Sequence, residues 1–292
     1  MANLKIEGWY TSLRALRITG RPGRPGDRQP EKIHHSEDCF REFFEQASQD
    51  GFSGVMTLGN SAVVGGLKKY RESNPDFQIF PVIPNVLDYV REATEYGLAG
   101  AGIRRLLRVG PLGFVRAGWL AATHPLHVLK KQFPTLLNIL CELEMGEFQT
   151  FRPPAVFLNQ QMTDLALSME NPAVLINFAT RCRESFGTEP GLLTANLVRL
   201  VDFLDKHQIP VELISAPYNR EQFLMPGDAG LYDEIIRGGK FQILVERISV
   251  ELPTPQDAID WAAGRQGIHA FVADYAPAMP PLQMEASAAG IE

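Results

Sequence analysis

Two carboxylates in the last part of the chain are the side chains best suited to chemistry. Glu246 lies in the apolar run KFQILVERIS and Asp274 near the end of the run GIHAFVADY, and both runs have the composition of β-strands. Paired carboxylates can act as a general base and a general acid, or they can hold a metal ion. We expect Glu246 and Asp274 to be the catalytic residues if their strands are neighbours.

Arg247 follows Glu246, and strand geometry should separate the two side chains. Successive residues of a strand point to opposite faces, so only one of the two should enter a given cavity. Leu244 and Ile248 share the parity of Glu246, which favours Glu246 as the inward residue. The alternative is that Glu246 forms an ion pair with Arg247 or with a lysine.

Neutral polar residues stand at the carboxyl ends of several other apolar runs, and asparagine is found at five of these ends. A single asparagine in such a place commonly serves a turn or a helix cap. The set as a whole indicates a ring of hydrogen-bond donors and acceptors that bind a substrate. We expect the pair Asn196 and Asn219 to share one pocket. The predicted substrate-binding residues are Asn60, Asn85, Asn159, Gln160, Asn196, Ser215, Tyr218 and Asn219.

The elements that must position these side chains are clearest between residues 188 and 219. The short apolar run GLLTAN stops at a polar tip, and apolar residues then recur at helical spacing from Leu197 to Leu204. A second apolar run, VELISA, begins at Val211. Two strands joined by a helix of about three turns form a parallel crossover unit.

The same alternation of strand and helix recurs along the chain, with a helix after every strand except the last. Strands are predicted at about 4–10, 54–59, 78–83, 154–159, 191–195, 211–216, 241–248 and 268–274.

This alternation resembles the (β/α)8 TIM barrel, in which active sites are built at the carboxyl ends of the strands. The segment INFATRCRESFGTEPGLLTAN, residues 176–196, faintly resembles the corresponding part of methylenetetrahydrofolate reductases, which share that barrel. An open doubly wound sheet is the alternative fold. We expect a single domain over residues 1–292, with a helical insert at 98–150 between the third and fourth strands and a frayed tail at 277–292.

The predicted insert is apolar and basic. No Asp or Glu occurs between Tyr96 and Cys141, whereas six Lys and Arg residues do. An apolar segment of this kind must be covered, by the barrel itself, by a second subunit in a homodimer, or by an anionic membrane. We expect packing on the barrel first and a homodimer next. Membrane contact is the least expected, because glycine and proline interrupt the helices.

Composition excludes several classes of protein. The chain is 45% hydrophobic and 21% charged, which is ordinary for a globular protein, and its net charge of −6 argues against a nucleic-acid partner. Three widely spaced cysteines, Cys39, Cys141 and Cys182, favour a reducing compartment. The N-terminus lacks the pattern of a secretory signal, so we expect a cytoplasmic protein.

Several features that the sequence lacks argue against particular kinds of active site. No lysine lies at the carboxyl end of a predicted strand, which argues against a Schiff-base enzyme. The loops SVELPTP and YAPAMPP contain no glycine, so a phosphate cup and a phosphate-anchored flavin are not expected. The pair His34-His35 invites a metal interpretation, but adjacent residues seldom face one ion, and we predict no metal site.

The sequence therefore predicts a TIM-barrel enzyme of the lyase or isomerase type that acts on a small or mid-sized organic substrate by carboxylate acid/base catalysis. The alternative is a non-catalytic barrel that docks on a partner protein or an anionic membrane surface through the insert. The cofactor, if the protein uses one, stays open.

Overall fold

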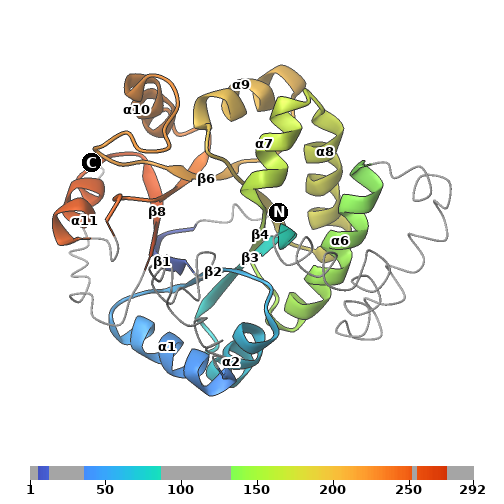
Figure 1. Ribbon diagram of the computed structural model, residues 1–292, viewed down its shortest axis with the longest axis vertical. Helices are drawn as coiled ribbons and strands as arrows, with labels where there is room; N and C mark the ends of the chain where they lie inside the picture. Colours follow the sequence, from blue (N-terminus) through green and yellow to red (C-terminus); the bar gives the residue numbers. More distant parts are fainter. Residues whose placement is uncertain (1–5, 13–35, 87–132, 252–254, 275–292) are drawn as a thin grey trace, which may run out of the picture.

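The computed structural model describes residues 6–12, 36–86, 133–251 and 255–274. Eight parallel strands pair in chain order, and β8 pairs with β1 to close a barrel (Figure 1). This confirms the (β/α)8 barrel and excludes the open doubly wound sheet. The strands are β1 (Gly8–Ser12), β2 (Gly54–Leu58), β3 (Gln78–Ile83), β4 (Ala155–Leu158), β5 (Glu189–Leu193), β6 (Leu213–Pro217), β7 (Gln242–Glu246) and β8 (Ile268–Ala273).

Helices surround the barrel on its outer side (Figure 1). A 3-10 turn, η1 (Gln149–Phe151), follows α6, and a π-helical turn, η2 (Cys182–Phe186), continues α8. The described α-helices are α1 (Glu37–Gln49), α2 (Ser61–Arg71), α6 (Phe133–Phe148), α7 (Gln160–Ser168), α8 (Pro172–Arg181), α9 (Leu197–His207), α10 (Ala229–Arg237) and α11 (Gln256–Ala263).

Helix α9 shows how the sequence sets an element of the wall. Its apolar residues recur every three or four positions, so Leu197, Leu200 and Leu204 are all buried on one face. The side chain of Asn196 caps the first turn by accepting a hydrogen bond from the Arg199 backbone N–H at 3.1 Å. The helix ends at Gln208, which takes the left-handed conformation with φ 52°.

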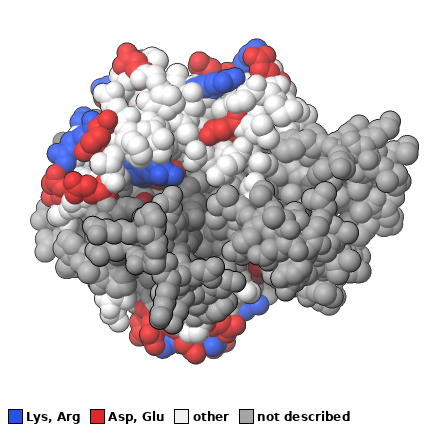
Figure 2. Space-filling view, viewed as in Figure 1, with Lys and Arg blue, Asp and Glu red and all other residues white. Residues whose placement is uncertain are grey.

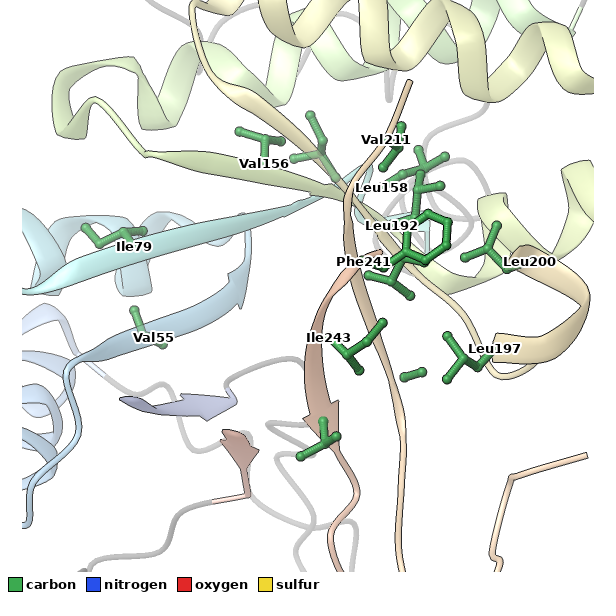
Figure 3. Close-up of a cluster of buried hydrophobic side chains, with 14 of the residues drawn as sticks. Val55, Ile79, Val156, Leu158, Leu192, Leu197, Leu200, Val211, Phe241 and Ile243 are labelled. Carbon is green, nitrogen blue, oxygen red and sulfur yellow. The ribbon is translucent and has the colours of Figure 1, made fainter. Parts of the chain in front are cut away.

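Alternate residues of each strand build two separate apolar cores. The outward residues pack beneath the helices, and Figure 3 shows Leu192 of β5 on the side that faces Leu200 of α9. The inward residues fill the barrel with their own cluster. The inward cluster is Ile6, Tyr10, Met56, Phe80, Val82, Ala155, Phe157, Leu193, Leu213, Leu244, Ala270 and Val272.

Aromatic rings and one glycine make the interior close-packed. Phe80 meets Tyr10 and Phe157 edge-on, with ring centroids 4.9 and 5.9 Å apart. A Cβ added at Gly191 would lie 2.5 Å from the Phe157 ring, so the neighbouring strand leaves space for that ring only because residue 191 is glycine. The barrel is therefore solid beneath its carboxyl end.

Three elements differ from the sequence prediction. Strand β1 begins at Gly8, four residues later than predicted. Gly8 itself has a positive φ of +111°. Helix α7 was not predicted, and it begins directly after β4 at Gln160. Helix α6 falls within the predicted insert, yet it contacts α8 and β3 and so belongs to the wall of the barrel (Figure 1). Residues 98–132, the tail at 277–292 and the helix predicted between the third strand and the insert lie outside the described residues.

Charges of both signs are interspersed over the described helices in the view of Figure 2. Lys69 of α2, for example, lies 3.1 Å from Glu37 and 2.9 Å from Asp38 of α1. Exposed pairs of this kind add little to stability. Among the described residues, no helix is both long enough and apolar enough to cross a lipid bilayer.

Candidate functional site

A cavity of about 120 Å³ lies at the carboxyl ends of the strands. Its apolar walls continue the barrel interior, and its polar groups come from the residues at or just after the strand ends. This is the place where the fold builds active sites, and the volume suits a small ligand better than a drug-sized one. The described lining residues are Ser12, Leu58, Val82, Asn85, Asn159, Gln160, Gln161, Leu193, Glu246, Arg247, Val272 and Asp274.

Both predicted catalytic carboxylates line this cavity. Strands β7 and β8 pair directly with Glu246 opposite Val272, so Asp274 follows two residues further along and both carboxylates line the same cavity. Glu246 is only 1% exposed, and its Oε2 accepts a hydrogen bond from the Ser215 hydroxyl at 3.1 Å. A buried carboxylate at the wall of an open cavity is placed to contact a small bound molecule.

Arg247 also lines the cavity, which overturns the expectation that only one of Glu246 and Arg247 could enter it. The strand ends at Glu246, and Arg247 takes the left-handed conformation with φ 48°. This conformation breaks the alternation of faces. The predicted alternation of faces places Leu244 correctly, because Leu244 lies inside the barrel. It does not extend to Ile248, which packs in the outer core.

Asn85 and Asn159 line the cavity and also fix its rim. The Asn85 backbone N–H lies 2.8 Å from both carboxylate oxygens of Glu144 on α6, and its side-chain amide donates to the Gly59 carbonyl at 3.1 Å. The Asn159 side-chain amide donates to the Pro84 carbonyl at 3.1 Å. These two asparagines therefore tie the ends of β2, β3 and β4 together.

Three of the other predicted binding residues act locally as caps or turn residues. Asn60 accepts a hydrogen bond from the Ala62 N–H at 2.9 Å and caps α2, and Asn196 caps α9. Asn219 accepts from the Phe223 N–H at 2.8 Å within the loop that follows β6. None of the three is among the described residues of the cavity wall. Neither Asn196 nor Asn219 is among the described residues of this cavity, their hydrogen bonds are those of a cap and a turn, and a pocket shared by the two stays a prediction.

Ser215 and Tyr218 are also absent from the described wall. The Ser215 hydroxyl donates to Glu246, which lines the cavity. Tyr218 points between α10 and α11, where its ring lies 5.2 Å from that of Trp261 and its hydroxyl donates to Asp233 at 2.5 Å. Tyr218 therefore stabilises the outer wall and does not face the barrel cavity.

Tyr218 should make the protein less stable at alkaline pH. Burial, followed by the hydrogen bond to Asp233, raises the pKa of Tyr218 from 10.0 to about 12. Because the raised pKa favours the neutral phenol in the folded state, its contribution is fully present below about pH 10 and is lost between about pH 10 and 12. We expect Tyr218→Phe to flatten the fall of the unfolding free energy in that window, by on the order of 1–3 kcal/mol. Urea unfolding at a series of pH values measures this, and an unchanged slope contradicts the linkage.

Several residues near the site were not predicted. Ser12 was missed because β1 was placed too early, and Gln161 because α7 was not recognised, although both have the expected position at a strand end. Glu144 lies in a helix far from any strand end and gives no signal in the sequence. Among the described residues, no group of three or more His, Cys, Asp and Glu side chains could hold a metal ion. His34 and His35 lie outside these residues.

No model of a known protein family matches the chain, and a search among curated proteins returns no match either. The fold and cavity define the class as a (β/α)8-barrel protein with a polar cavity at the carboxyl ends of its strands. Because this fold supports many unrelated functions, the function must be argued from the side chains of the cavity.

Proposed function

We propose that the protein is an enzyme of the lyase or isomerase type that moves protons on a small polar organic substrate bound in the barrel cavity. The observation that carries this proposal is the nearly complete burial of Glu246 at the wall of the cavity, where a second carboxylate, Asp274, also lies. Two carboxylates in one cavity supply the base and the acid that such a reaction needs.

In the proposed reaction Glu246 removes a proton from a carbon next to a carbonyl group of the substrate. The electron pair of the broken C–H bond moves into the enolate. In an isomerisation of a β,γ-unsaturated carbonyl compound, Asp274 gives a proton to the γ carbon of the resulting dienolate, so that the carbon–carbon double bond moves next to the carbonyl group and the carbonyl re-forms. In an elimination, Asp274 protonates a leaving hydroxyl group, which departs as water with its bonding electrons. Either role requires Asp274 to begin protonated and Glu246 to begin ionised.

The remaining wall residues bind and orient the substrate. Gln160 and Gln161 begin α7 and present carboxamides, and Asn85 and Asn159 add polar atoms to the rim. Leu193 forms part of the apolar floor. A floor of this kind keeps water away and strengthens electrostatic interactions inside the cavity.

A cytoplasmic setting is part of the proposal. None of the three cysteines forms a disulfide, and Cys39 is exposed whereas Cys141 and Cys182 are buried. Burial raises the pKa of the Cys141 and Cys182 thiols, so both are unreactive packing residues.

A homodimer through the insert stays a prediction, as does docking on a partner, because residues 98–132 lie outside the described part of the chain. The cofactor stays open.

A bulky residue at the cavity mouth should block the activity. Gln161 is exposed on the first turn of α7 and lines the cavity, so Gln161→Trp should fill the mouth without disturbing the barrel core. We expect conversion of the substrate to fall by at least about tenfold, because the indole displaces the substrate from its reacting position. Pools of small polar metabolites incubated with the protein and followed by mass spectrometry measure this.

Ser168→Trp is the matched control, because Ser168 is exposed at the other end of the same helix. It should convert the same compound at the rate of the unmodified protein. The proposal fails if the unmodified protein converts no compound, or if both tryptophan variants lose activity equally.

A further inference from the structure

We infer that the cavity selects substrates that carry a carboxylate group, and that the guanidinium of Arg247 binds this group. The inference rests on the proposed function and names its substrate class. Three observations support it: the charges of the cavity wall, the environment of the Arg247 side chain, and the backbone that directs it.

Arg247 is the only cationic side chain among the described residues of the cavity wall, beside the two carboxylates of Glu246 and Asp274. One guanidinium complements one singly charged anion, and its planar fork matches the two oxygens of a carboxylate. A phosphate dianion beside two carboxylates would need more positive charge than the described residues of this wall provide. The charge of these described residues therefore favours a carboxylate over a phosphate.

The Arg247 side chain is available to a ligand. Its Nε lies 4.0 Å from Glu246 Oε1, beyond hydrogen-bonding distance, and the side chain is 43% exposed. Within the described part of the chain, no hydrogen bond from this guanidinium to another side chain is present. The guanidinium is thus close enough to Glu246 to hold a ligand beside that carboxylate. Its Nε does not form a direct hydrogen bond to Glu246.

The backbone of Arg247 is held in its left-handed conformation by a neighbouring loop. The buried Asn219 side chain donates to the Arg247 carbonyl at 3.0 Å, and the Tyr218 N–H donates to the Glu246 carbonyl at 3.1 Å. A non-glycine residue with positive φ is uncommon, and such residues concentrate at functional sites. Asn219 is therefore a positioning residue for Arg247, although it does not line the cavity itself.

The test compares carboxylates with their neutral amides on the full-length protein. Acetate, glycolate and alanine are titrated beside acetamide, glycolamide and alaninamide, with inorganic phosphate as a further arm, and binding is followed by thermal shift and NMR. We expect the carboxylates to bind and the amides to bind weakly. Arg247→Gln should raise the carboxylate Kd by about 10- to 100-fold, and Arg247→Lys by less, because lysine keeps the charge and loses the fork.

Two further variants make the test specific. Arg265→Gln is the control, because Arg265 stacks on Trp261 outside this cavity, and it should leave carboxylate binding unchanged. Asn219→Asp keeps an acceptor for the Phe223 N–H and loses the donor to Arg247. We expect it to lower the preference for carboxylate over amide several-fold, which a general loss of stability does not do.

The outcomes separate this inference from the proposed function. Carboxylate binding that depends on Arg247, in a protein that converts no compound, supports the inference while the proposed function fails. Turnover that depends on Glu246, on a substrate without a carboxylate, supports the proposed function and overturns the inference. Phosphate binding tighter than carboxylate binding, equal binding of acids and amides, no binding of any probe, or unchanged binding in Arg247→Gln also overturns it.

Discussion

Glu246→Gln should remove turnover while the barrel stays folded. Glutamine has nearly the same volume as glutamate, and its carbonyl oxygen can still accept the hydrogen bond from Ser215. It cannot take up a proton, so the step assigned to the general base is lost. We expect kcat to fall by about 10²- to 10⁴-fold, the usual contribution of a positioned acid or base. Steady-state kinetics on the substrate found in the metabolite pools measure the loss.

Two variants show whether the loss is specific. Glu234→Gln removes a carboxylate from the exposed face of α10 and should leave kcat unchanged. Ser215→Ala keeps the carboxylate and removes its hydrogen-bond donor, so we expect a smaller fall than for Glu246→Gln. The assigned role is wrong if Glu246→Gln turns over the substrate at the original rate with an unchanged unfolding midpoint.

The barrel could be predicted because its signals are local and repeated. Each strand is a short apolar run, and a helix such as α9 carries apolar residues on one face only. Helix α7 was missed because it is short and begins with the polar sequence Asn159-Gln160-Gln161, which is typical of a loop. Helix α6 was assigned to an insert because its wide apolar surface does not show which neighbours cover it.

The candidate site was predictable where a residue type and a strand end coincide. Glu246, Asp274, Asn85, Asn159 and Gln160 all line the cavity for this reason. The same rule also selects asparagines that cap helices, and the sequence does not separate the two uses.

Arg247 was not expected to line the cavity, because side chains alternate between the two faces of a strand. That alternation holds only within the strand, and Arg247 follows its last residue. The left-handed turn that brings its side chain to the cavity depends on a hydrogen bond from Asn219, 28 positions earlier in the chain. No local pattern in the sequence encodes that contact. The positions of Arg247 and Glu144 both depend on tertiary contacts, and only the structure provides them.

Helix α6 links the stability of the barrel to the geometry of the cavity. Glu142 and Glu144 lie two residues apart on this helix, so they face different neighbours, and both are buried. Glu142 accepts a hydrogen bond from Arg181 of α8 at 2.7 Å, and Glu144 holds the backbone of Asn85 at the cavity rim. The Glu142 and Arg181 pair joins α6 to α8, and Glu144 joins α6 to the rim of the cavity.

Arg181→Met should therefore destabilise the protein by about 3 kcal/mol, because it leaves the Glu142 carboxylate buried without its partner. Glu142 is 2% exposed and Arg181 25%, so most of the desolvation falls on the carboxylate. The double variant Glu142→Met with Arg181→Met removes both charges and should recover most of the lost stability. Urea unfolding of the two single variants and the double variant measures the coupling. Turnover of the double variant should equal that of the unmodified protein, because Glu144 still holds Asn85. If the double variant is as unstable as Arg181→Met, the loss does not come from the unpaired Glu142 carboxylate.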